Sequence, residues 1–210
     1  CLAGASLPHR RDGRPITAWK KVGKHRVRKS LDDFPYWRGG LDDLHDAYRG
    51  ICAYYCFRVE KAALPQVDHF VAKADAAPAL AYEWSNFRLA CGYANTCKND
   101  SPAVLDPAQI HAGEFVLDLA TLRVAPGDSV KGARRVQVDG TIQRLKLNEG
   151  RALEVRQHAM AHFRAERVGL GFLEMDHPFL AAELRRQGVA DATQLPAVPA
   201  SVRTAVEPEL

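Results

Sequence analysis

Polar residues enclosed by apolar ones mark the centre of the chain. V-D-H-F (67–70) places apolar residues on both sides of a polar pair, as expected of a short β-strand. F-R-L-A (87–90) predicts a second strand, and the run from Cys91 onward predicts a turn that leads into a short helix. This order of strand, loop, strand and helix could bring the polar side chains of residues 67–100 into one cleft.

The segment before this central unit has apolar residues at helical spacing. Leu41, Leu44 and Tyr48 recur at helical spacing, and Gly50 ends the run. We therefore expect residues 30–50 to form a helical entry segment whose apolar side chains pack against the core.

Alternation of apolar and polar residues returns after the central unit. It is present in E-F-V-L-D-L-A-T-L-R-V (114–124) and in R-V-Q-V-D (135–139), with P-G-D between them. A turn signal between two alternating runs predicts a hairpin or a pair of strands.

Two further helices are predicted beyond this strand pair. The first extends from about Glu149 to Val168, with Asn148 as its candidate N-cap. Pro178 near the start and Gly188 after the end mark a second, shorter helix. Taken together, these elements predict an α+β fold in which helices flank the central unit and an additional small strand pair.

Length and composition allow one domain of ordinary size, since the chain has 210 residues. We divide it into a basic N-terminal arm (1–30), a core with its helical entry segment (31–100), a strand and helix region (101–190) and a loosely ordered tail (191–210). The sequence contains no run of about eighteen apolar residues that could span a membrane. No apolar stretch follows the basic segment as in a secretory signal, so we expect a cytoplasmic protein without membrane contact.

The net charge of +4 is unevenly distributed. Residues 1–30 contain nine basic residues and one acidic residue, so the rest of the chain carries a net negative charge. Basic N-terminal arms commonly bind nucleic acid by neutralising phosphates. A solubilising tail, or an arm that docks on an acidic partner, would have the same composition. The candidate nucleic-acid-binding residues are Arg10, Arg11, Arg14, Lys20, Lys21 and Lys24.

The central unit contains the residue types needed to hydrolyse a phosphodiester bond. A neutral imidazole can take a proton from water near neutral pH, so His69 is the candidate general base. Carboxylate and amide oxygens suit Mg²⁺ or Mn²⁺, so Asp68 and Asn95 are the candidate ligands of one divalent ion. Such an ion would act as a Lewis acid and stabilise the leaving oxygen. Each of these residues taken singly is more often a surface or turn residue.

The order Asp-His, Asn, Asn-x-x-Lys resembles the HNH endonuclease motif. Asn86 and Asn95 are nine residues apart, and Lys98 follows three residues later, as in that motif. The resemblance implies a ββα-metal HNH core and an endonuclease activity. It also implies that Asn86, or its backbone carbonyl, orients the His69 ring and that Lys98 holds a phosphate of the nucleic acid.

The cysteines fall near the places where many HNH proteins bind a structural zinc through two C-x-x-C pairs. The corresponding stretches here read C-A-Y-Y-C and C-G-Y-A-N-T-C. Cys52 and Cys91 match the first ligand of each pair, whereas a tyrosine and an alanine stand at the second positions. Cys56 and Cys97 would complete a four-cysteine site only with unusual spacing. We therefore expect buried thiols rather than a structural zinc.

A further resemblance extends beyond the core. The V-L-D-P element (104–107), the strand pair and T-I-Q-R-L-K-L-N (141–148), followed by an Arg-containing helix, resemble small HNH proteins of bacterial anti-phage systems. Among these, the HNH subunits of Septu-type and retron-associated modules are the nearest in pattern, and they work beside an ATPase of the ABC/SMC-like class. The resemblance implies a nuclease effector that docks such an ATPase through residues 101–190.

Other functions remain open at this stage. A nucleic-acid-binding or assembly subunit that does not cut could retain the same fold. An RNA-cutting toxin could use the same residues, because the chemistry attacks a phosphodiester bond in either polymer. We expect a metal-dependent endonuclease, with DNA rather than RNA as its substrate.

Overall fold

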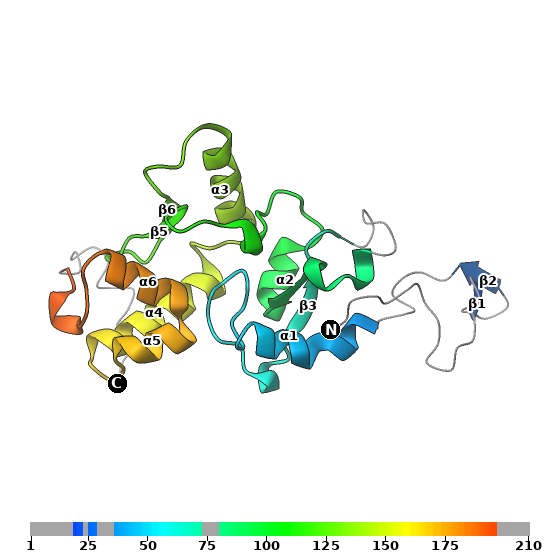
Figure 1. The fold of residues 1–210 in the computed structure, drawn as a ribbon, viewed down its shortest axis with the longest axis horizontal. Helices are drawn as coiled ribbons and strands as arrows, with labels where there is room; N and C mark the ends of the chain where they lie inside the picture. The colour runs from blue at the N-terminus through cyan, green and yellow to red at the C-terminus, as the bar shows by residue number, and fades with distance from the viewer. Residues whose placement is uncertain (1–18, 23–24, 29–35, 73–79, 197–210) are drawn as a thin grey trace.

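The computed structural model describes residues 19–22, 25–28, 36–72 and 80–196. Within these residues, helices alternate with three separate pairs of antiparallel strands, so the predicted α+β class is confirmed. In Figure 1, α4, α5 and α6 gather at the left, whereas α1, α2 and β3 lie near the centre. No helix in the described part of the chain is long and apolar enough to cross a membrane.

The central unit has the predicted order of elements. β3 (Gln66–His69) pairs antiparallel with β4 (Phe87–Ala90), and the register places Asp68 opposite Arg88. All four residues of β4 are buried, as expected of a strand covered on both faces. α2 (Gly92–Lys98) follows one residue later and packs against β3. The two predicted strands and the predicted helix are therefore confirmed.

α1 (Leu41–Ala47) precedes the central unit in the sequence and packs against it. It follows a 3₁₀-helix (Tyr36–Gly40) and contacts both β3 and β4. Its predicted inward residue, Leu44, is almost completely buried. The small core that results consists of Trp37, Leu44, Ala81, Tyr82, Phe87 and Leu89. From residue 36 to residue 50 the entry segment is thus confirmed as a packing element, although its α-helix is only two turns long, and residues 30–35 lie outside the described residues.

The additional strand pair lies closer together in the sequence than predicted. β5 (Phe115–Leu117) and β6 (Val124–Pro126) both fall within or next to the first alternating run. Asp118 makes the turn between them, because its Oδ1 accepts hydrogen bonds from the backbone N–H groups of Ala120 and Thr121, each at 2.8 Å. This Asx-type turn inside an apparently continuous strand pattern explains the hairpin.

The prediction of a strand at residues 135–139 is wrong, because they lie inside α3 (Gly132–Arg144). Val138 and Ile142 are buried four residues apart, which is helical spacing, whereas Val136 is 71 % exposed. The alternation of R-V-Q-V-D was therefore a coincidence of composition, since only one of its two valines faces the core.

α4 (Gly150–Arg164) occupies most of the range predicted for the long helix. Its N-cap residue is Glu149, not Asn148, so the predicted cap is wrong. The side chain of Asn148 instead holds β6: it accepts from the N–H of Val124 at 2.6 Å and donates to the Val124 carbonyl at 2.8 Å. Among the described residues β6 pairs only with β5, and the Asn148 side chain gives this strand two further hydrogen bonds.

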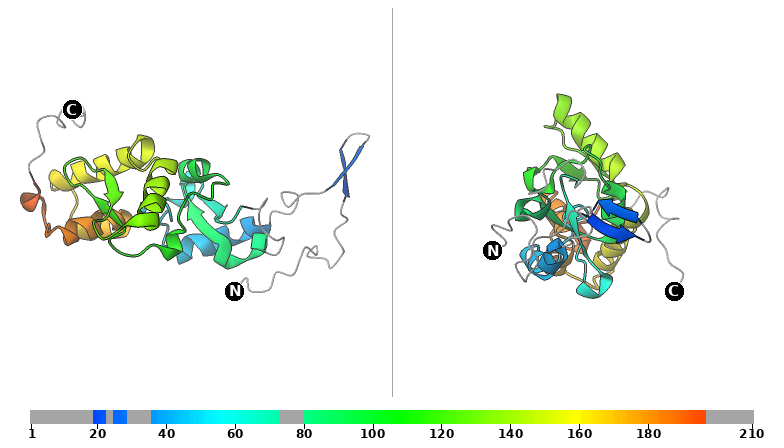
Figure 2. Two further views of the ribbon diagram at one scale, coloured as in Figure 1. Left: turned by 90° about the horizontal axis from the view of Figure 1, so that it is seen from above. Right: turned by 90° about the vertical axis from the view of Figure 1, so that its right-hand side faces the viewer.

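α5 (Leu170–Asp176) and α6 (Pro178–Arg186) complete the C-terminal region. The shorter predicted helix is confirmed, with Pro178 in its first turn and Gly188 beyond its end at φ +76°. Buried side chains from α3 to α6 and from the β5–β6 hairpin join Tyr54, Tyr55 and Phe57 in one large core. Figure 2 shows that these C-terminal helices lie at one end of the molecule and β3 nearer its middle.

Part of the basic arm forms a hairpin. β1 (Trp19–Val22) pairs antiparallel with β2 (His25–Arg28) and lies at the end of the molecule opposite the C-terminal helices (Figures 1 and 2). The strand β1 contains two of the candidate phosphate-binding residues, Lys20 and Lys21. The other four, Arg10, Arg11, Arg14 and Lys24, lie outside the described residues.

Candidate active site

The two central polar residues end β3 and make separate contacts. Successive side chains of a strand point to opposite faces, and Asp68 and His69 follow this rule. Asp68 contacts Lys98 of α2 and Tyr54, whereas the His69 ring lies edge-on to the rings of Trp37 and Phe87. Both polar side chains are buried. The structure therefore brings Asp68 and Lys98 together and gives His69 its own set of neighbours.

Lys98 is the most deeply buried charged group of the site, with 1 % of its surface exposed. Its Nζ lies 3.2 Å from Oδ1 of Asp68, 2.9 Å from the His69 carbonyl and 3.2 Å from the Asn99 carbonyl. The three donors of an ammonium match these three acceptors. Lys98 therefore neutralises Asp68 inside the protein in this structure, rather than pointing towards solvent as expected of a phosphate-binding residue.

Tyr54 completes the environment of Asp68. Its hydroxyl donates a short hydrogen bond to Oδ2 of Asp68, an oxygen that also lies 3.2 Å from Nζ of Lys98. Burial raises the pKa of Tyr54 above its ordinary value, and the negative charge of Asp68 raises it further. The phenol therefore remains a hydrogen-bond donor at neutral pH. Tyr54 is not among the site residues predicted from the sequence, since nothing in the local pattern C-A-Y-Y-C indicates a contact with β3.

The His69 ring is fixed by a backbone carbonyl. Its Nε2 lies 2.9 Å from the oxygen of Ala81. A carbonyl can only accept a hydrogen bond, so Nε2 carries the hydrogen and the lone pair of the neutral ring is on Nδ1. This tautomer makes Nδ1 the atom that could take a proton from water.

Asn86 closes the loop that connects β3 with β4. Its Oδ1 accepts from the N–H of Val71 at 2.8 Å, and its Nδ2 donates to the carbonyls of Val71 at 3.1 Å and Leu80 at 3.2 Å. These bonds join the two ends of the loop. They also fix Leu80, the residue directly before Ala81, whose carbonyl accepts a hydrogen bond from His69. Asn86 thus has an indirect route by which it can orient the His69 ring.

Asn95 lies on α2, one turn before Lys98. Its Nδ2 donates to Oε1 of Gln66, the first residue of β3, at 2.8 Å. This bond uses the nitrogen of the amide, whereas a metal ion would bind its oxygen. The helix thereby places Asn95 and Lys98 against the same strand that carries Asp68.

The residues fit a divalent ion on one condition. Asp68 and Asn95 supply hard oxygen donors of the kind that Mg²⁺ and Mn²⁺ prefer. An ammonium in contact with the same carboxylate would repel a divalent cation, so Lys98 would have to leave Asp68 when the ion binds. Once released, Lys98 would be available for a phosphate oxygen, which is the role that the resemblance to the HNH motif implies for it.

An ion pair next to the site fixes the chain after α2. Two of the three nitrogens of the Arg88 side chain, Nε and Nη2, donate to Asp106, at 2.8 and 2.6 Å respectively. Arg88 is the cross-strand partner of Asp68 and is itself buried. Asp106 belongs to the V-L-D-P element, so this motif has a structural role: it ties the segment after α2 to β4.

Cys52 and Cys91 lie in the large core, whereas Cys56 and Cys97 are half-buried. Cys52 Sγ accepts a weak hydrogen bond from the N–H of Cys91 at 3.4 Å, and Cys56 and Cys97 are also free thiols. Tyr55, at one expected second-ligand position, is buried and donates its hydroxyl to the Leu145 carbonyl at 2.8 Å. Among the described residues, no group of three or more His, Cys, Asp or Glu side chains is placed to hold a metal ion.

The candidate site therefore combines a fixed imidazole on one side of β3 with a neutralised carboxylate on the other. Its polar groups come from β3, the loop before β4, α2 and Tyr54. No protein-family model matches the chain, and neither does any curated protein.

Proposed function

We propose that this protein is a metal-dependent endonuclease of the HNH type that hydrolyses phosphodiester bonds, with DNA as the preferred substrate. The observation that carries the proposal is the orientation of His69. Its Nε2 donates to the Ala81 carbonyl, which fixes the orientation of the ring at a strand end that also carries Asp68. A buried histidine held in one tautomer suits a general base better than it suits a surface contact.

Each remaining residue has a role in this proposal. Asp68 and Asn95 would hold Mg²⁺ or Mn²⁺, which stabilises the leaving oxygen when bound. Lys98 would exchange Asp68 for a phosphate oxygen, so that its charge is used in the complex with substrate. Asn86 would keep the loop closed and hold the acceptor of His69 in place.

We further propose that the nuclease acts as the effector of a bacterial anti-phage complex with an ABC/SMC-like ATPase. The V-L-D-P element and the C-terminal helices support this setting by their resemblance to such subunits. In α5, Phe172 and Met175 are large apolar side chains that are exposed. Exposed apolar residues near one another on a short helix are suited to contact with another protein.

One observation favours a second function, that of a nucleic-acid-binding or assembly subunit that does not cut. Asp68 is neutralised by Lys98 and receives the hydroxyl of Tyr54, and all three side chains are buried. Such a satisfied cluster is stable without a metal ion. If Lys98 never leaves Asp68, the fold persists and the chemistry is absent.

A cleavage assay on plasmid DNA and on total RNA, with Mg²⁺ or Mn²⁺, separates these functions. The key variant is His69→Asn, because the ring is packed between two aromatic side chains and alanine would leave a cavity. His45→Asn is its matched control, since His45 also directs Nε2 to a backbone carbonyl, that of Val59 at 2.8 Å, but lies in α1.

We expect metal-dependent cutting by the wild type and by His45→Asn, and none by folded His69→Asn. Each protein is assayed alone and with any ATPase that co-purifies with it. Binding of nucleic acid without cutting, in the presence of that partner, would support the assembly subunit instead. Preferential cutting of RNA would identify the other polymer as the substrate.

A further inference from the structure

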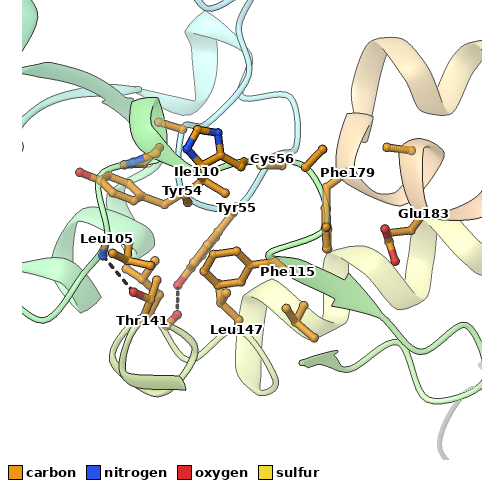
Figure 3. A pocket seen from close by; sticks show the side chains of 18 of the residues that line it. Tyr54, Tyr55, Cys56, Leu105, Ile110, Phe115, Thr141, Leu147, Phe179 and Glu183 are labelled. Atoms are coloured by element: carbon orange, nitrogen blue, oxygen red, sulfur yellow. Dashed lines mark hydrogen bonds between the residues drawn. The ribbon is translucent and has the colours of Figure 1, made fainter. Parts of the chain in front are cut away.

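A pocket of about 440 Å³ lies between the central unit and the C-terminal helices. Its walls come from the segment before β3, the loop that leads to β5, the end of α3, and α6. Most lining side chains are apolar or aromatic, and Figure 3 shows the rings of Tyr55 and Phe115 directed into it. A pocket of this size with such walls is of the kind that binds small molecules.

Arg156 of α4 is a lining residue with an unusual environment. It is 5 % exposed, and its guanidinium donates to two backbone carbonyls, those of Leu122 and Leu147. A guanidinium has five N–H donors, so these two bonds leave capacity for another acceptor. None of the ion pairs between described residues includes Arg156.

A buried cation without an acidic partner is costly, and its charge must be compensated. Burial lowers the pKa of Arg156 to about 10, so the group remains charged at neutral pH. An anionic ligand would supply the compensating charge.

The acidic group in the wall does not serve this purpose. Glu183 accepts from Nε of Arg186 at 2.8 Å and from Nη2 of the same residue at 2.7 Å. It also accepts from the N–H of Leu117 at 2.7 Å. Because Glu183 is neutralised by Arg186, the pocket keeps the net positive charge of Arg156.

We propose that this pocket binds a small organic anion that has an aromatic or apolar body and a carboxylate or phosphate group. The body would lie among Tyr54, Tyr55, Phe115 and Phe179, and the anionic group would bind Arg156. Charge and shape lead to the same class of ligand, because the walls exclude a strongly hydrated anion and the guanidinium disfavours a neutral hydrocarbon.

The pocket shares one residue with the candidate active site. Tyr54 lines the pocket, and its hydroxyl donates to Asp68. The binding proposal does not depend on nuclease activity, since it follows from the walls and from Arg156 alone. It can therefore be tested on protein that cuts nothing.

Calorimetric titration with naphthoate and with the neutral naphthamide provides the test. These two probes share one aromatic body and differ in the charge of one group. We expect the wild type to bind naphthoate about tenfold more tightly than naphthamide, which corresponds to one charge-assisted hydrogen bond. Naphthyl phosphate is a third probe, and the tighter of the two anions identifies the preferred anionic group.

Two variants test the two parts of the proposed site, the guanidinium and the apolar volume. Arg156→Gln should remove the preference for the anion. Ala182→Phe fills the pocket from an exposed position of α6 and should weaken every probe at least tenfold, whereas Ala133→Phe, at an exposed position of α3 outside the pocket, should bind as the wild type does. Equal affinity for naphthoate and naphthamide, unchanged binding by Ala182→Phe, or no binding of any probe at millimolar concentration would overturn the proposal.

Discussion

Nζ of Lys98 lies 3.2 Å from Oδ1 of Asp68, and this buried ion pair joins the end of α2 to the end of β3. This ion pair affects two properties of the protein. It sets the stability of the central unit, because each charge compensates the other where water is excluded. It also controls the availability of the carboxylate that the proposed nuclease needs for its metal ion.

The contribution of this pair to stability can be measured with single and double variants. Lys98→Met leaves Asp68 as an uncompensated buried charge, so we expect it to lower the free energy of unfolding by about 3 kcal/mol. Adding Asp68→Asn to Lys98→Met removes that charge and should restore more than half of the loss. Urea denaturation of the wild type, the two single variants and the double variant gives the free energies of unfolding. If the two substitutions are additive, the residues do not interact energetically.

The central unit was predictable because its signals are local. In V-D-H-F and F-R-L-A, apolar residues flank polar ones, and both segments contribute to strands, β3 and β4. The direction of the Lys98 side chain was not predictable, because it depends on a carboxylate thirty positions away in the sequence. Short-range patterns place a residue on a helix, but they do not determine which of several acceptors its side chain will reach.

In the C-terminal region, two predictions from local sequence patterns were wrong. Residues 135–139 alternate like a strand, yet tertiary packing selects the helical set Val138 and Ile142. Asn148 has the residue type of an N-cap, but its amide matches both backbone groups of Val124 and is used there. In both places, contacts with residues distant in the sequence decided the structure, and the local pattern did not.

An ion pair between the hairpin region and α3 makes stability depend on pH. Nε and Nη2 of Arg134 donate to Glu114 at 2.6 and 2.7 Å, and these bonds lower the pKa of Glu114 to about 2, from an ordinary value of 4.5. A lowered carboxyl pKa stabilises the fold above pH 4.5, and that contribution is lost as the pH falls towards 2. We expect Glu114→Gln to cost about 1 kcal/mol at pH 7, after allowance for solvent screening of the partly exposed Arg134.

Thermal unfolding at several pH values measures this difference. The gap between wild type and Glu114→Gln should narrow as the pH falls through the range from 4.5 to about 2. Glu154→Gln, a change at an exposed residue of α4, is the control and should follow the wild type at every pH. A gap that stays constant with pH would mean that the Glu114 carboxylate gains nothing from Arg134.

The basic arm provides a prediction that depends on salt. Deleting residues 1–30 should weaken nucleic-acid binding and flatten its dependence on salt concentration, because each lost phosphate contact lowers the slope of log K against log[salt] by about 0.9. The measurement is a titration of labelled duplex at several salt concentrations. A full-length control with glutamine at the six candidate positions should match the deletion: Arg10, Arg11, Arg14, Lys20, Lys21 and Lys24. An unchanged slope in both proteins would show that the arm contacts no phosphates.

Competition between Lys98 and a divalent ion for Asp68 can be tested without nucleic acid. If the ion must displace the ammonium, Lys98→Met should bind Mn²⁺ about tenfold more tightly than the wild type, since about 1.4 kcal/mol of repulsion has been removed. Isothermal titration of metal-free protein measures this affinity, and circular dichroism verifies that the variant is folded. Lys131→Met, at an exposed residue outside the site, is the matched control.

Two further substitutions identify the ligands in the same experiment. Asp68→Asn should abolish the binding that Lys98→Met strengthens, because it replaces a charged carboxylate by a neutral amide. Asn95→Ala should weaken the binding, because it removes an amide oxygen donor of the proposed ion. Equal Mn²⁺ affinity in the wild type and in Lys98→Met would mean that the ion pair does not guard the carboxylate. Binding that survives Asp68→Asn would place the ion elsewhere. The buried cluster would then be a structural feature of a subunit that binds nucleic acid without cutting it, because the metal chemistry of hydrolysis needs a ligand at this strand end.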